Sequence, residues 1–223
     1  GLAGEALLDA AYQRVKLLLD LAGSALAFAG AHAPSYAERP AAFARLCPAV
    51  PALAAVLPAS FASDLAQAAR AKTAPAAADL AAPSAAHVRR ALVATVPALA
   101  AVLRWELQAL LGVEAPLPAL LEGWLRRPGL RRRAWEWARV ALHPLPAPLP
   151  LSPLRGARLF WRSTPRGLLD AAGALAYLGL AGERPAPGAV ARLLPLRRRA
   201  LPCTPPDERR AVVALWRWCV RNG

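Results

Sequence analysis

The stretch Ser84–Gly112, SAAHVRRALVATVPALAAVLRWELQALLG, decides the fold class of this 223-residue chain. Alanine and leucine dominate it, and both residues favour helix. Ser84 predicts an N-cap and Gly112 a left-handed terminating residue, so we expect one helix between them. Pro97 is expected to kink or split that helix, because proline removes a backbone donor and clashes with the preceding turn.

The same composition extends over the whole chain, which has 56 alanines, 40 leucines and no isoleucine. Because β-branched residues are scarce, strands have little to be built from. The sequence therefore predicts an all-α fold, an irregular domain of about 8 to 10 helices with proline-rich connections. The expected helices are 5–29, 40–46, 50–57, one capped by Ser60 that ends near 72, 84–111, 117–126, 130–142, 167–180, 189–199, and one capped by Thr204 that ends near 221. Between them, 73–82 fits a loop or a weak helix equally well.

The clearest interruption is 143–153, HPLPAPLPLSP, in which five prolines favour polyproline II over helix. It fits a linker, a docking ligand for a proline-reading module, or a brace packed across the helices. We favour the brace because leucine occupies positions between the prolines. The sequence is interpreted as a single helical domain over 1–223.

Net charge divides the chain into a neutral part, 1–122, and a strongly basic part, 123–223. The first has nine basic and nine acidic side chains, whereas the second has nineteen arginines against five acids, a net charge of +14. The choice of arginine over lysine fits the codon usage of a GC-rich genome, but codon usage does not explain the asymmetry. A charge so one-sided indicates a polyanionic partner, and nucleic acid is the first candidate.

The most suggestive basic segment is Trp124–Arg139, WLRRPGLRRRAWEWAR. Arginine forks bind phosphate, so Arg131, Arg132 and Arg133 are candidate phosphate contacts. On a helix, Trp135 would lie between Arg131 and Arg139 and could stack on an unpaired base. The alternative is a solvated face on which these arginines lie over the indole.

A predicted apolar stripe sets the orientation of this helix. It consists of Leu130, Ala134, Trp137 and Ala141, and it places Trp137 in the core.

Two further arginine clusters lie nearer the C-terminus. Arg197, Arg198 and Arg199 come near a predicted helix end, where cations also complement the helix dipole without a ligand. In the last helix, Arg210, Arg217 and Arg221 are expected to face outward. An anionic membrane surface is a second possible partner for this basic helix.

The buried face of the last helix is expected to hold four residues at helical spacing. They are Val212, Leu215, Trp216 and Cys219.

Signatures of catalysis and metal binding are missing from the sequence, which predicts a protein that is not an enzyme and has no cofactor. No phosphate loop, dinucleotide turn, zinc-protease helix or nucleophile elbow occurs. The three cysteines and three histidines are widely spaced, which argues against a metal site or a disulfide framework. The apolar run 91–103 is too short to span a bilayer and contains Pro97, so no transmembrane segment is expected.

Two segments, LRWELQALLG (103–112) and ERRAVVALWRWCVRNG (208–223), together with the GC-type composition, resemble a viral family. The chain is similar to the C-terminal domain of the alphaherpesvirus tegument proteins encoded by the twenty-first gene of the unique long segment. The resemblance implies a virion adaptor that binds RNA and other viral tegument or host proteins. It also implies a location in the tegument and in the host cytoplasm and nucleus.

The sequence thus supports two hypotheses. The first is a noncatalytic domain whose basic surface binds nucleic acid without sequence preference, RNA or single strands rather than duplex DNA. The second is an interaction scaffold for acidic protein partners, in which nucleic-acid binding is incidental. Neither hypothesis fixes an oligomeric state.

Overall fold

The computed structural model confirms the all-α class. It describes residues 4–75, 84–142, 153–179, 189–194 and 204–222. Within these ranges 81% of the residues are helical, in eleven helices and no strands. The proline-rich segment 143–152, expected to form a brace, lies outside the described residues.

Contacts divide the chain into two compact units, residues 1–113 and 114–223. The sequence predicted a single domain with a charge boundary after residue 122. The contacts place the division earlier, after Val113, so the helix that contains residue 122 belongs to the second unit. We call residues 1–113 unit 1 and residues 114–223 unit 2, and describe each by itself.

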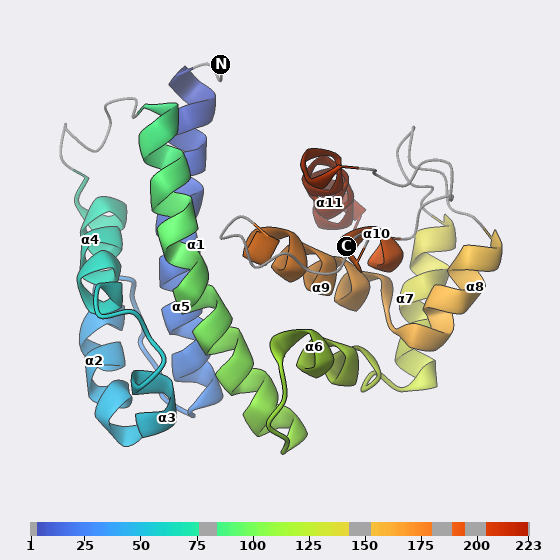
Figure 1. The fold of residues 1–223 in the computed structure, drawn as a ribbon, viewed down its shortest axis with the longest axis horizontal. Helices are drawn as coiled ribbons and strands as arrows, with labels where there is room; N and C mark the ends of the chain where they lie inside the picture. The colour runs from blue at the N-terminus through green and yellow to red at the C-terminus, as the bar shows by residue number, and fades with distance from the viewer. Residues whose placement is uncertain (1–3, 76–83, 143–152, 180–188, 195–203, 223) are drawn as a thin grey trace. The chain divides into compact units, whose positions relative to one another are not determined.

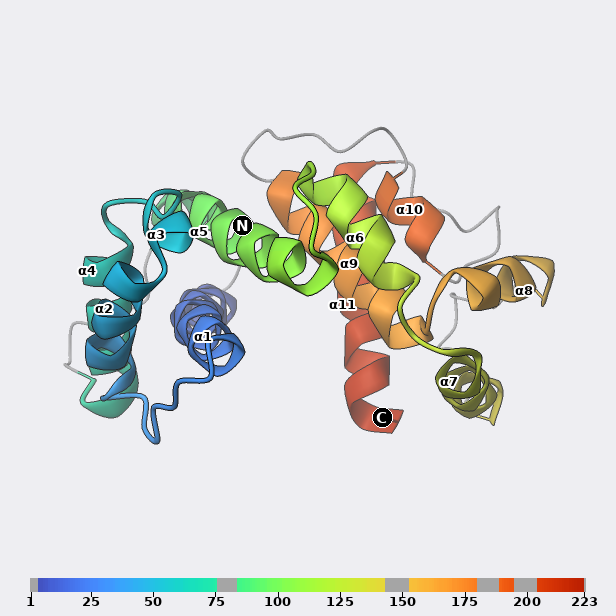
Figure 2. The ribbon, with the colours of Figure 1, turned by 90° about the horizontal axis from the view of Figure 1, so that it is seen from below.

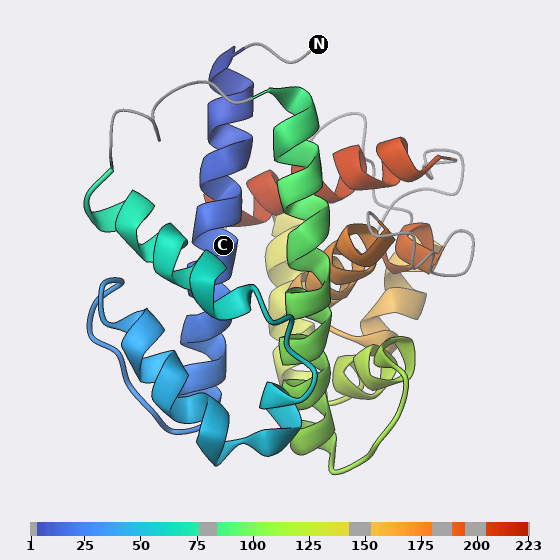
Figure 3. The ribbon, with the colours of Figure 1, turned by 60° about the vertical axis from the view of Figure 1, so that its left-hand side comes forward.

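Unit 1 is built around two long helices that lie side by side (Figures 1 and 3). Its helices are α1 (Gly4–Phe28), α2 (Arg39–Ala49), α3 (Pro51–Ala54), α4 (Phe61–Thr73) and α5 (Ala85–Leu111). α1 contacts α2, α4 and α5, so its leucines are enclosed. The rings of Phe43 and Phe61 meet edge to face, 5.2 Å between centroids, and join α2 to α4.

Both predicted ends of α5 are confirmed. The Ser84 hydroxyl accepts a hydrogen bond from the His87 amide at 3.2 Å, and Gly112 ends the helix with φ +67°. The expected split at Pro97 is wrong, because α5 continues through it. Pro97 is exposed although Val96 and Ala98 beside it are buried, so its ring lies on the solvent side of the helix.

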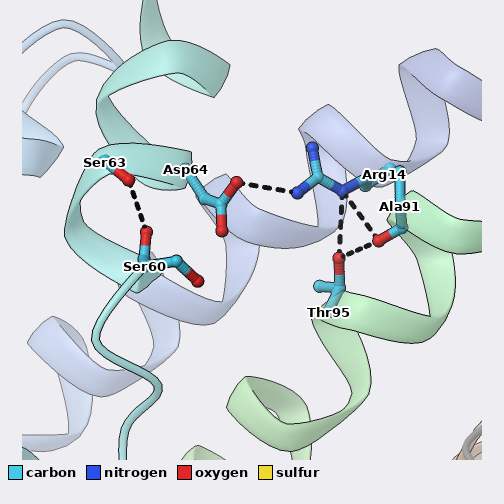
Figure 4. Close-up of polar contacts among 6 residues, drawn as sticks. All are labelled: Arg14, Ser60, Ser63, Asp64, Ala91 and Thr95. Atoms are coloured by element: carbon cyan, nitrogen blue, oxygen red, sulfur yellow. Dashed lines mark hydrogen bonds and ion pairs between the residues drawn. The ribbon is translucent and has the colours of Figure 1, made fainter.

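A polar junction holds three helices of unit 1 together (Figure 4). The Arg14 guanidinium of α1 donates to Asp64 Oδ1 on α4 at 2.9 Å, and to Ala91 O and Thr95 Oγ1 on α5, each at 3.0 Å. Thr95 is 2% exposed, and its hydroxyl both accepts from Arg14 and donates to Ala91 O at 2.9 Å. This arginine is therefore part of the fold.

Unit 2 is organised around α9. Its helices are α6 (Leu117–Leu125), α7 (Leu130–Leu142), α8 (Pro153–Arg162), α9 (Pro165–Leu178), α10 (Ala189–Leu193) and α11 (Pro205–Asn222). α9 contacts α6, α7, α10 and α11, and α8 lies beside α7 (Figure 2). Thr164 caps α9 by accepting from the Gly167 amide at 3.1 Å.

Some predicted helices differ from those observed. Ser60 precedes α4, but its side chain makes no capping bond, and its carbonyl accepts from Ser63 Oγ (Figure 4). α8 was not predicted. It begins at Pro153, a residue that the sequence analysis assigned to the proline run, although proline suits the first turn of a helix.

Candidate nucleic-acid interface

The three consecutive arginines of α7 have different environments. Arg133 is 8% exposed, and its guanidinium donates to Trp161 O at 2.5 Å and Arg126 O at 2.7 Å. Trp161 lies in the last turn of α8 and Arg126 follows the last residue of α6, so Arg133 joins the ends of two helices to α7. Burial and these two bonds disfavour the predicted phosphate contact of Arg133, although its Nε is buried without a hydrogen-bond partner among the described residues.

The buried face of α7 also differs from the predicted apolar stripe. Trp137 is partly buried, as that stripe requires, and its indole N–H donates to Ser163 O at 2.9 Å. Leu130 is 57% exposed and Ala134 is exposed, whereas Val140 is 6% exposed. The buried side of α7 is therefore rotated relative to the apolar stripe predicted from the sequence, and it contains Arg133 and Trp137, which hydrogen-bond to neighbouring segments.

The other candidates on α7 remain at the surface. Arg131 is exposed, and Arg132 is exposed while pairing with Glu136 at 2.9 Å. Trp135 is 67% exposed, one turn from Arg131. Arg139, at the next turn, is partly buried and has a polar contact.

A stronger basic surface lies on α11. Three of its arginines line a shallow, open depression of about 420 Å³ on the surface of the helix, together with Val213 and Ala214. Among them, Arg209, Val213 and Arg217 follow one another at helical spacing, and Arg210 lies beside them. Trp216, 52% exposed, borders the same face. We call the surface formed by Arg209, Arg210, Val213, Trp216 and Arg217 the α11 face.

Local sequence explains why α11 begins where it does. The Thr204 hydroxyl accepts from the Asp207 amide at 3.3 Å, as the predicted cap requires. The Thr204 hydroxyl also donates to the Asp207 carboxylate, which lowers the pKa of Asp207, and Arg210 lies 2.6 Å from that carboxylate. The pair of Asp207 and Arg210 is exposed, so it stabilises the helix little and leaves Arg210 available to a stronger anion.

The opposite side of α11 packs on α9. Ala211 and Leu215 are buried, and a Cβ atom built on Gly173 of α9 would lie 3.7 Å from Val212 Cγ1. Because alanine and glycine are small, α11 lies close to α9 along this line. Burial of Leu215 is confirmed and Val212 is partly buried, whereas the predicted burial of Trp216 is wrong.

Sequence reasoning placed Arg210 and Arg217 outward, and both are exposed. It missed Arg209 and Trp216 as parts of this surface. The helical spacing of Arg209, Val213 and Arg217 in the sequence could have placed Arg209 on this surface. Arg197–Arg199 lie outside the described residues, as do the side chains of Cys219 and Arg221.

Charge counting shows that unit 2 cannot neutralise its arginines internally. It contains nineteen arginines and seven acidic residues, a net charge of +12, whereas unit 1 contains nine basic and seven acidic residues. Even if every acid paired with a different arginine, twelve would keep an unbalanced charge. A positive potential over unit 2 follows from its composition.

Metal-ligating side chains do not cluster in the part of the chain that the structure describes. No three histidine, cysteine or acidic side chains lie close enough there to hold a metal ion. Burial raises the pKa of the Cys47 thiol, which disfavours the reactive thiolate. Burial also raises the pKa of Glu106, whose hydrogen bond is with Ser24.

By length and composition, α5 is the one described helix that could cross a membrane. Core helices of water-soluble domains meet the same criterion. Here α5 contacts α1 and α3, and its buried residues include Val96, Ala98 and Val102, so this criterion is weak evidence for a membrane span.

Comparison with protein-family models, with curated proteins and with solved structures found no match to this chain.

Proposed function

We propose that this chain is a noncatalytic nucleic-acid-binding domain that binds single-stranded RNA through the α11 face. The observation that carries the proposal is that Arg209, Arg210 and Arg217 lie on one side of α11 around a shallow depression, beside a tryptophan that is half exposed. The guanidinium groups supply phosphate contacts, and the indole supplies a stacking surface.

The mechanism is phosphate neutralisation with release of counterions. The arginines are spaced along about two turns of α11, so they can contact successive phosphates of an extended strand. A single strand is favoured over a duplex because its bases are free to stack on Trp216. Contacts of this kind read the backbone, so binding carries no strong sequence preference.

The resemblance to the alphaherpesvirus tegument family extends this proposal to a biological setting. In that setting the domain acts as an adaptor in the virion tegument and in the host cytoplasm and nucleus, binding RNA and other proteins. The much larger net positive charge of unit 2 supports a division of labour, with nucleic acid bound by unit 2.

Fluorescence anisotropy with a labelled oligouridine of about 20 nucleotides tests the proposal. We expect the Arg210→Glu/Arg217→Glu variant to bind at least about tenfold more weakly, because two phosphate contacts become repulsions. Arg89→Glu/Arg90→Glu is the matched control, since it reverses two exposed arginines of α5 with the same change in net charge. It should retain most of the affinity.

Trp216→Ala separates stacking from charge, since it should weaken binding without altering the dependence on salt. Equal losses in the two double variants would contradict the proposed site, and so would full affinity in the α11 variant. Arg131→Glu/Arg132→Glu tests the exposed arginines of α7 and leaves Arg133 in place, because loss of this buried residue would disturb folding.

A further inference from the structure

A second surface of unit 2 has a different chemistry from the α11 face. One side of α7 exposes Leu130, Ala134, Trp135, Ala138 and Leu142, which we call the α7 apolar face. Leu130, Trp135 and Leu142 are 57%, 67% and 76% exposed, and both alanines are exposed as well. This is a contiguous apolar stripe along a 13-residue helix, of the kind that marks an interaction site.

The described residues leave this stripe exposed. α7 is attached to unit 2 through its opposite side, where Arg133 and Trp137 hydrogen-bond to carbonyls at the end of α8 and Val140 is buried. Burial of leucine and tryptophan would normally stabilise the unit, so their exposure here leaves binding energy for a partner.

The shape of the stripe suits another helix. Ala134 and Ala138 lie one turn apart and form a low strip, while Trp135 and the two leucines rise beside it. Small side chains let a second helix approach closely, and the larger ones fit between its residues. An amphipathic helix binds such a surface through apolar residues at i, i+3, i+4 and i+7.

Charge determines which helix fits. Arg131 lies within the stripe and Arg132 at its edge, and the unit as a whole carries nineteen arginines against seven acids. A second copy of the chain would bring like charge against like charge, which disfavours self-association through this face. An acidic partner would gain both apolar burial and opposite charge.

We propose that the α7 apolar face is a protein-docking surface that takes an acidic amphipathic helix of a partner protein. This inference goes beyond the binding of RNA and uses a different helix, so either proposal can fail without the other. Most of the stripe offers RNA little, because its alanines and leucines carry no donor for phosphate and Arg131 is the one arginine within it.

The test uses the full chain and a designed probe. A labelled peptide of about 14 residues matches the length of α7, about 20 Å. It carries leucines at i, i+3, i+4 and i+7 and glutamates elsewhere, and a scrambled peptide of the same composition is its control. Anisotropy should show binding of the designed peptide that is at least about tenfold tighter than that of the scrambled one.

Leu142→Glu should weaken peptide binding by at least about tenfold, because it places a carboxylate against the acidic helix. Val113→Glu is the matched control, since it adds the same charge at an exposed valine of unit 1, and it should leave peptide affinity unchanged. Trp135→Ser gives a second, uncharged change with the same expected loss. Far-UV circular dichroism of each variant confirms that the helices are retained.

Three results would overturn the inference. In the first, the designed and scrambled peptides bind equally. In the second, Leu142→Glu binds the peptide as tightly as the original chain. In the third, Leu142→Glu would convert a dimer to a monomer or abolish oligouridine binding, which would assign the stripe to a second copy or to RNA.

Discussion

The two units use arginine in different ways. In unit 1 basic and acidic residues nearly balance, and Arg14 is bound to Asp64, Ala91 and Thr95 inside a helix junction. In unit 2 basic residues outnumber acids nineteen to seven, and the two terminal guanidinium nitrogens of buried Arg133 donate to backbone carbonyls instead. A basic cluster in the sequence thus combines structural and exposed arginines, and burial in the fold distinguishes them.

The largest expected effect comes from Arg133→Ala. It removes two charged hydrogen bonds and leaves the carbonyls of Trp161 and Arg126 without this donor, so we expect unit 2 to lose about 3 kcal/mol of stability. Arg132→Ala, one residue away at an exposed ion pair, should cost less than about 0.5 kcal/mol. Urea unfolding followed by circular dichroism measures both. Similar losses in the two variants would remove the distinction between structural and surface arginines.

A smaller effect is expected in unit 1 for Arg14→Met. This change leaves the Asp64 carboxylate without its cation and Thr95 Oγ1 without its donor, and we expect it to cost about 2 kcal/mol. Arg14→Met/Asp64→Leu should recover part of the loss, because no unpaired charge remains. Amide hydrogen exchange should show faster exchange in α1, α4 and α5 of the single variant. Unchanged exchange there would contradict the role of Arg14 as a junction.

The smallest effect concerns pH and Glu106. Burial raises the pKa of Glu106 above its usual value of 4.5, and one of its carboxylate oxygens is buried without a partner. As pH rises through 4.5 the unfolded chain ionises first, so this group lowers the stability of unit 1 until the folded carboxyl also ionises. Glu106→Gln should therefore match the original chain near pH 3 and exceed it by under about 1 kcal/mol near pH 7. The same stability difference between Glu106→Gln and the original chain at both pH values would contradict ionisation of Glu106 as its cause.

Much of the fold follows from local sequence signals. Ser84, Gly112 and Thr204 predicted helix ends that the structure contains, because caps depend on residues within one turn. α8 was missed because the proline run obscured Pro153 as a helix start. The length of α5 was predicted, but the expected split at Pro97 was wrong, because the helix continues through this exposed proline.

The candidate site was less predictable. Arg131, Arg132 and Arg133 span most of the circumference of a helix, so only contacts with α6 and α8 decide that Arg133 is the buried one. The helical spacing of apolar residues predicted that Trp216 is buried. Ala211 and Gly173 are small, however, and let α11 pack on α9 through another side of the helix. Such choices depend on neighbours distant in sequence.

The most direct test of the central claim is the salt dependence of oligouridine binding. For the original chain we expect a steep fall in affinity, linear in a plot of log affinity against log salt. Arg210→Glu/Arg217→Glu should reduce the slope by about 1.4, the value for two phosphate contacts on a single strand. Arg89→Glu/Arg90→Glu should leave the slope unchanged. A flat response in the original chain, or the same reduction in both variants, would contradict a nucleic-acid surface on α11.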